Sequence, residues 1–146
     1  MGRLFTLREA EELLPSVERW LREAIESKKN AAEAEAHLNA MLLRIHVFGG
    51  IQVDVPRAAE LKTAKEKSEE HLRQALEEFE NNGVVVKDLD IGLIDFPTLF
   101  DGEEVYLCWK LGETGIGFWH HTTEGYAGRK QIDGDFLERH KGGRPH

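Results

Sequence analysis

One stretch of the sequence, from Thr6 to Phe48, has the pattern of a single helix of about forty residues, long for a chain of 146. Apolar residues recur along it with the 3.5-residue period of a coiled-coil seam, so one face must pack on a partner. Thr6 with Glu9 three residues later predicts a capping box at its start, and Gly49 and Gly50 are typical of a helix end. The remaining residues must fit around this helix.

A second helix is predicted from Pro56 to Asn81, because proline suits the first turn of a helix and Asn82-Gly83 follows as a stop signal. The short connection makes the two helices antiparallel neighbours. The second helix is shorter and reaches back only to about residue 23 of the first. The first helix therefore has an N-terminal overhang, and its apolar stripe should pack on another part of the chain: Leu13, Leu14, Val17, Trp20, Leu21 and Ile25.

From Val84 onward the pattern is that of strands, over residues 84–88, 93–100, 103–111 and 116–121. Asp101-Gly102 favours a two-residue hairpin turn that would pair Asp95 with Cys108. A second turn over residues 112–115 would place Cys108 near Trp119. The predicted fold class is α+β: a long antiparallel two-helix hairpin, coiled-coil-like, followed by a small antiparallel β-meander of three to four strands packed on the N-terminal part of helix 1.

Length and composition are those of one domain over residues 1–133, with the helical hairpin at 6–81, the strand block at 84–121 and a loop to 133. The remaining residues, 134–146, are rich in Gly, Lys, Arg and His. They are expected to form a loosely held tail, with Phe136 and Leu137 as the available anchors.

Charge and cysteine content limit the function classes. There are 19 Lys and Arg against 27 Asp and Glu, a formal net charge of -8, which repels a phosphate backbone and argues against nucleic-acid binding. No apolar run has the length of a membrane span, and the N-terminus has no hydrophobic signal region. The one cysteine, Cys108, cannot form an internal disulfide. A cytoplasmic protein is expected.

The common enzyme signatures, such as a phosphate-binding glycine loop or a zinc-protease helix, are absent from the sequence. The Glu-x-x-His pattern of a di-iron bundle is absent too, since the residues three positions before the helical histidines His37, His46 and His71 are Ala34, Leu43 and Ser68. The sequence therefore leaves open whether the protein is an enzyme.

Carboxylate, imidazole and thiolate donors do gather in the strand block, and together such groups would bind a divalent transition metal or transfer protons. The candidate metal ligands are His120, Glu113, Glu124, Asp95, Cys108 and His121. A plain structural explanation is also open, because a cysteine within a strand is often a small buried hydrophobe and a histidine at a strand end is often simply hydrogen-bonded.

The predicted register divides these candidates. It puts Asp95 and Cys108 on one face of the sheet and His120 on the other, apolar face. A site at His120 would then use Glu113, Glu124 or a residue of the helix overhang, whereas a site at Asp95 and Cys108 would recruit His121. The first alternative is favoured, because a histidine on an apolar face needs a partner to offset its desolvation.

Several runs carry a family resemblance: Phe5 to Ala10, Leu14-Pro15, Val86 to Asp90, Gly92 to Pro97, Val105 to Trp109, Gly112-Glu113, Trp119-His120 and Gly125 to Arg129. Over about residues 4–131 the chain resembles the DUF2203 family of bacterial proteins. The resemblance implies a bacterial origin and a helical hairpin followed by strands, but no known activity, ligand or catalytic residue. It favours His120 over His121, which lies outside the Trp-His pair.

Two functional hypotheses follow. In the first, the protein is an interaction or scaffold module that forms a homodimer, or binds another protein, through its hairpin. A two-helix hairpin buries one side of each helix, and Met41, Leu42, Ile45 and Phe48 make an apolar end that nothing else covers. In the second, the protein is a metal-dependent or small-molecule-binding enzyme with a site around His120. The substrate, reaction and partner are not indicated.

Overall fold

The structure is a computed structural model that describes residues 3–48 and 54–140. The chain forms two compact units. The sheet unit contains residues 3–21 and 77–140 of the described chain, and the hairpin unit contains residues 22–48 and 54–76. The first helix, α1 (Leu7–Phe48), contributes to both units, as does α2 (Val55–Asn81).

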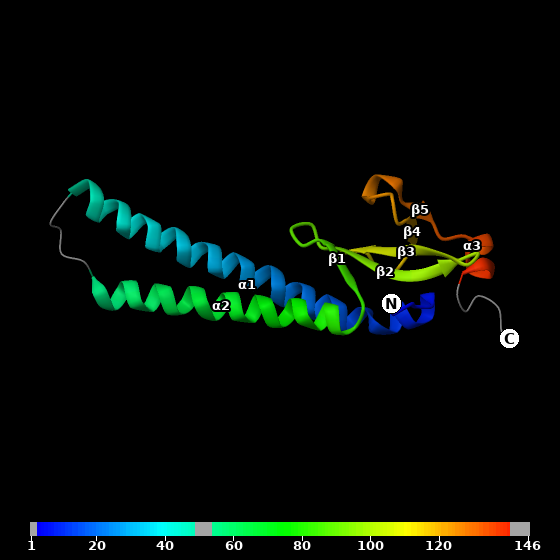
Figure 1. The fold of residues 1–146 in the computed structure, drawn as a ribbon, viewed down its shortest axis with the longest axis horizontal. Coiled ribbons are helices and arrows are strands. Elements are labelled where there is room, and N and C mark those ends of the chain that lie inside the picture. The colour runs from blue at the N-terminus through cyan, green and yellow to red at the C-terminus, as the bar shows by residue number, and fades with distance from the viewer. Residues whose placement is uncertain (1–2, 49–53, 141–146) are drawn as a thin grey trace. The chain divides into compact units, whose positions relative to one another are not determined.

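In the hairpin unit, α1 and α2 run antiparallel as predicted (Figure 1). Its buried apolar residues are mostly small: Ala24, Ala34, Leu61 and Ala75. Alanine thus takes the place that larger apolar residues, such as Leu21, hold elsewhere in α1. The Asp54 side chain caps α2 by accepting a hydrogen bond from the Arg57 backbone N–H at 3.0 Å. The predicted helix end at Gly49-Gly50, the connection over residues 51–53 and the Phe48 side chain lie outside the described residues.

The start of α1 confirms the predicted capping box. The Thr6 backbone N–H donates to Glu9 Oε1 at 2.9 Å, and the Glu9 N–H donates to Thr6 Oγ1 at 3.0 Å. Each side chain thus satisfies a backbone donor that has no partner within the helix. Pro15 lies inside α1, which continues past it.

The sheet unit contains an antiparallel meander with the strand order β1-β2-β3-β4-β5. Its strands are β1 (Val85–Asp88), β2 (Leu93–Phe100), β3 (Glu103–Lys110), β4 (Phe118–His121) and β5 (Lys130–Gln131). The predicted α+β class and meander are confirmed, with five strands instead of three to four. The added strand, β5, is formed where the chain returns to β4 after the 3-10 helix η1 (Tyr126–Gly128).

The turn between β2 and β3 has the predicted conformation. Asp101 and Gly102 both have positive φ, 51° and 78°, as a type I′ turn requires. Asp95 lies opposite Cys108 as a result.

The predicted register between β3 and β4 is wrong by one residue. Cys108 lies opposite Phe118 instead of Trp119. The chain reverses early, because the Glu113 backbone N–H donates to the Lys110 carbonyl at 3.0 Å while the Glu113 side chain accepts from the Lys110 N–H at 2.7 Å. A shift of one residue moves every β4 side chain to the opposite face of the sheet.

The part of α1 up to Leu21 belongs to the sheet unit, as predicted for the overhang, whereas Ile25 of the predicted overhang lies in the hairpin unit. Leu13 and Leu14 are half-buried. Val17, Trp20 and Leu21 are buried. Just before the helix, the Phe5 ring meets the Phe96 ring edge to face, with centroids 5.4 Å apart. The Phe5 N–H also donates to the Pro97 carbonyl at 2.7 Å. Pro97 lies beyond the end of β1, where no described strand pairs with β2 on that side. The sheet is therefore anchored at the start of α1.

Residues 134–140, expected to be loosely held, form a packed segment in the structure. Helix α3 (Gly134–Arg139) is capped by Asp133, and Phe136 is 1% exposed. The Phe136 ring stacks on Phe100 and Trp119, with centroid distances of 5.2 Å and 4.9 Å. Phe136 is thus an anchor as predicted, whereas Leu137 is 40% exposed. The domain boundary at residue 133 stays a prediction, and residues 141–146 lie outside the described chain.

Among the described residues, no helix combines the length and the apolar character needed to cross a membrane.

Candidate metal centre

Three predicted donors meet on one face of the sheet. Asp95 on β2 lies opposite Cys108 on β3, and His120 on β4 lies opposite Tyr106, two residues from Cys108 on the same face. The three side chains are almost fully buried, with exposed fractions of 0%, 0% and 1%. The early reversal of the chain at Lys110 therefore brings His120 to the face from which the sequence analysis had excluded it.

Hydrogen bonds fix the orientation of the His120 ring. Its Nδ1 lies 2.8 Å from the His121 carbonyl oxygen, and its Nε2 lies 2.9 Å from Asp95 Oδ1. A carbonyl oxygen can only accept, so Nδ1 carries a hydrogen. Nε2 and Asp95 Oδ1 would repel each other at 2.9 Å if both presented lone pairs. A hydrogen on one of these two atoms must therefore lie between them.

The centre is compact and incompletely satisfied. One donor atom from each of Asp95, Cys108 and His120 lies within 4.8 Å of the other two. Within the described chain no hydrogen-bond partner reaches the second carboxylate oxygen, Asp95 Oδ2, although it is buried. Buried polar atoms without a partner are uncommon in folded proteins, and this oxygen is available to accept a further contact.

The Cys108 thiol is held in its protonated form. Burial, followed by the negative charge of Asp95, raises its pKa from 9.0 to about 12, although the positive charge of Arg129 acts in the opposite direction. The folded state thus binds this proton more tightly than the unfolded chain does. The resulting stabilisation is present below about pH 9 and is lost as the pH rises from about 9 to about 12.

Cys108 in chelator-treated, folded protein is therefore expected to resist alkylation. At about pH 8 its thiolate fraction should be roughly 1,000-fold lower than in the unfolded chain, and burial slows the reaction further. The measurement is the rate of iodoacetamide labelling by mass spectrometry, with and without denaturant. Similar rates in the two conditions would contradict a buried thiol.

The arrangement does not fit nucleophilic catalysis by cysteine. In such sites one imidazole nitrogen faces the thiol and the other is oriented by a third group. Both nitrogens of His120 are already engaged, by the His121 carbonyl and by Asp95. Neither is left to take the Cys108 proton, so these three side chains are not arranged as a cysteine-based catalytic triad.

A buried arginine covers part of the same face. The Arg129 guanidinium lies 3.9 Å from the centroid of the Phe118 ring and 4.8 Å from that of the Tyr126 ring. Phe118 is the residue of β4 that lies opposite Cys108. The Arg129 guanidinium donates to Glu113 Oε2 at 2.6 Å. Glu113, predicted as a ligand partner of His120, is instead the counter-ion of Arg129 and the cap of the β3–β4 reversal.

The other two candidates lie elsewhere. Glu124 Oε1 accepts from the His121 backbone N–H at 2.9 Å and from Lys130 Nζ at 2.7 Å. The half-buried His121 side chain borders a surface hollow of about 450 Å³ that Glu103 and Glu104 also line. The expectation that His120 would use Glu113 or Glu124 was thus wrong. The reason is the shifted register, which places the His120 side chain on the same face as Asp95 and in contact with it.

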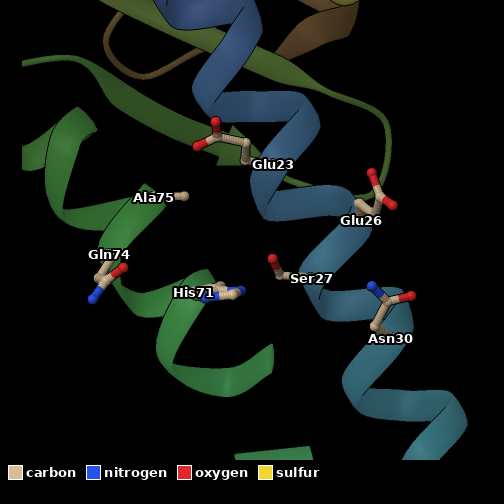
Figure 2. Close-up of a pocket in the computed structure, with 7 residues that line it drawn as sticks. All are labelled: Glu23, Glu26, Ser27, Asn30, His71, Gln74 and Ala75. Atoms are coloured by element: carbon tan, nitrogen blue, oxygen red, sulfur yellow. The ribbon is translucent and has the colours of Figure 1, made fainter. Parts of the chain in front are cut away.

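A second place with mixed polar side chains lies in the hairpin unit. A hollow of about 440 Å³ between α1 and α2 is lined by Glu23, Glu26, Ser27, Asn30, His71, Gln74 and Ala75. Figure 2 shows Ser27 and His71 directed toward each other across it, with Glu26 and Gln74 directed away. The only group of three or more metal-binding side chains found among the described residues is the one in the sheet unit. The hollow therefore does not compete as a metal site.

Sequence reasoning missed the role of Arg129, which entered only as the end of a family motif. Its partner Glu113 is 16 residues away, and no local pattern predicts such a pairing. The one available signal was an arginine three residues after Tyr126 in a glycine-rich segment, since guanidinium groups stack on aromatic rings.

Comparison with known proteins gives a family and no activity. Residues 3–132 match the family described as "Uncharacterized conserved protein (DUF2203)". The chain belongs to the DUF2203 family. All three residues of the buried centre lie inside the matched range, whereas α3 of this DUF2203 protein lies beyond it. Neither a curated protein nor a solved structure matches the chain.

Proposed function

We propose that this DUF2203 protein holds a transition-metal ion between Asp95, Cys108 and His120. The observation that carries the proposal is the meeting of a carboxylate, a thiol and an imidazole, all buried, with donor atoms within 4.8 Å of one another. Thiolate and imidazole are the donors that transition metals prefer in proteins.

The hydrogen bond from His120 Nδ1 to the His121 carbonyl supports this proposal. A histidine that binds a metal through one nitrogen usually donates the other N–H to a carbonyl or carboxylate, which fixes the tautomer and the ring orientation. Here the bond of Nδ1 to the His121 carbonyl turns Nε2 toward Asp95, so Nε2 is the nitrogen that would bind an ion shared with that carboxylate.

The burial of the centre favours a structural role over turnover of a substrate. The three donors come from three neighbouring strands, β2, β3 and β4, so an ion bound to them would link these strands. The side chains are at most 1% exposed, and Arg129 and Phe118 cover the same face. We therefore propose that the ion stabilises the sheet.

The test compares two adjacent histidines. Protein purified without chelator or affinity metal should contain about one transition-metal ion per chain, and the His120→Ala variant should contain less than about a tenth of that. His121→Ala is the matched control and should keep the wild-type content, because His121 lies in the surface hollow. Equal metal content in all three proteins, as measured by elemental analysis, would rule the proposal out.

We further propose, as a second candidate, that the hairpin unit associates with a second copy. Four large apolar side chains near its connecting end are well exposed: Leu42 by 61%, Leu43 by 61%, Val47 by 60% and Val55 by 67%. The unit also has no net charge, with nine Lys and Arg and nine Asp and Glu over residues 22–76, so two copies would not repel each other strongly.

Light scattering tests this association. The wild-type protein should be a dimer at micromolar concentration, and the double variant Leu42→Lys, Leu43→Glu should be a monomer. Ile91→Lys, which changes an exposed apolar residue of the sheet unit, is the control and should leave the dimer intact. A wild-type monomer at every concentration up to about 1 mM would exclude self-association in this range.

A further inference from the structure

We infer that the ion bound by Asp95, Cys108 and His120 is a divalent, thiolate-preferring metal of the zinc class in four-coordinate geometry. This inference rests on the proposed function and adds the chemical class of the ion. It is drawn from the donor set, the charge of the centre and the space between the donors.

The donor set excludes the hard divalent cations. Mg²⁺ requires near-octahedral oxygen coordination and Ca²⁺ takes six to eight oxygen ligands. The centre offers one carboxylate, and its other donors are the sulfur of Cys108 and a nitrogen of His120. Sulfur and nitrogen donors with a single carboxylate are typical of Zn²⁺ and of ions with similar ligand preferences.

Charge balance favours an ion of charge +2. When a metal is bound, Cys108 contributes a thiolate and Asp95 a carboxylate, while His120 is neutral. The two negative charges are cancelled by a divalent ion, whereas a monovalent or trivalent ion would leave one unpaired charge in a buried site. The positive charge of the neighbouring Arg129 also acts on Cys108, but it is opposed by the negative charge of its partner Glu113.

The spacing of the donors fits a four-coordinate ion. In tetrahedral zinc sites, with metal–ligand bonds of about 2.0–2.3 Å, the ligand atoms lie about 3.3–3.7 Å apart. The donor atoms here are separated by distances between 2.9 Å, for the His120–Asp95 contact, and 4.8 Å. The spacing of a tetrahedral zinc site thus lies within the range of distances that these donors already span.

The fourth position has a donor at hand. Asp95 Oδ2 is buried and no described group donates a hydrogen bond to it. Asp95 can therefore bind the ion through both oxygens, or through one while the other holds a single water molecule. Six-coordinate ions need further donors, and the metal-binding group in the described chain has three members.

Cobalt(II) is the probe for the test, because a cobalt–thiolate bond absorbs strongly in the near ultraviolet and four-coordinate cobalt absorbs more strongly in the visible than six-coordinate cobalt. Chelator-treated protein titrated with Co²⁺ should develop both absorptions at about one ion per chain. One equivalent of Zn²⁺ should abolish them, whereas about a 100-fold excess of Mg²⁺, Ca²⁺ or Mn²⁺ should not. Cys108→Ser should lack the near-ultraviolet absorption, and His121→Ala should retain it.

The outcomes separate this inference from the proposed function. Stoichiometric cobalt uptake with only weak, six-coordinate absorption, or displacement by Mg²⁺ or Mn²⁺, would overturn the zinc-class inference and leave metal binding intact. An unchanged near-ultraviolet band in Cys108→Ser would also overturn it, because the thiolate would then not be a ligand. Absence of cobalt and zinc uptake in equilibrium dialysis would overturn the proposed function itself.

Discussion

Replacing His120 by alanine in chelator-treated protein is expected to lower the free energy of unfolding by about 3–5 kcal/mol. The substitution removes the imidazole partner of Asp95 Oδ1, and Oδ2 has none among the described residues. The fully buried carboxyl group then loses its imidazole partner and keeps only the neighbouring Cys108 thiol, which costs far more than a lost surface contact. Denaturant unfolding followed by circular dichroism measures the effect.

A double-mutant cycle identifies the cause. If the cost comes from the loss of the imidazole partner of Asp95, His120→Ala should lower the free energy of unfolding by about 1–3 kcal/mol less in the Asp95→Ala background than in the wild type. His121→Ala, adjacent in the sequence and half-buried, should cost less than about 1 kcal/mol. Equal, small effects of the two histidine substitutions would mean that the contact between His120 and Asp95 does not stabilise the sheet.

Replacing Phe136 by alanine is expected to cost about 3–5 kcal/mol. Phe136 is 1% exposed, and its ring stacks on Phe100, Trp119 and His140. Its removal leaves a cavity among aromatic rings and also releases α3, whose other large apolar residue, Leu137, is 40% exposed. The measurement is again denaturant unfolding, combined with limited proteolysis at α3.

Leu137→Ala is the matched control, since it shortens the adjacent apolar side chain of the same helix. Its expected cost is below about 1 kcal/mol, because the side chain is well exposed. If the two substitutions had equal costs, α3 would not be held by Phe136. Faster proteolysis of α3 in Phe136→Ala alone would place the anchor at this residue.

The helices were predictable because their signals are local. The capping box of Thr6 and Glu9 predicted the start of α1 to within one residue, and the predicted range of the second helix differs from α2 by one residue. Such signals depend on hydrogen bonds between residues three or four apart, so a short segment of the sequence contains all the residues involved. The β2–β3 turn was predictable for the same reason, because Asp101 and Gly102 adopt positive φ.

The β3–β4 register was not predictable from the turn alone. The glycines of the 112–115 segment suggested a reversal centred on them, but the Glu113 side chain binds the Lys110 N–H and starts the reversal one residue earlier. The apolar character of the β3 and β4 side chains would have predicted the register better than the composition of the turn. Placing Trp119 with the apolar Leu107, its observed neighbour, would have put His120 beside Asp95 and Cys108.

The sequence by itself determined the α+β class, the two long helices, the strands and the residue types from which a metal centre would be built. Only the tertiary structure decided which donors meet, because a one-residue change in strand register exchanges the two faces of a sheet. It also decided that Glu113 pairs with Arg129 and that Phe136 anchors α3, since these contacts join residues 16 or more positions apart. Local patterns specify backbone conformation, whereas the packing of distant segments specifies which side chains share a site.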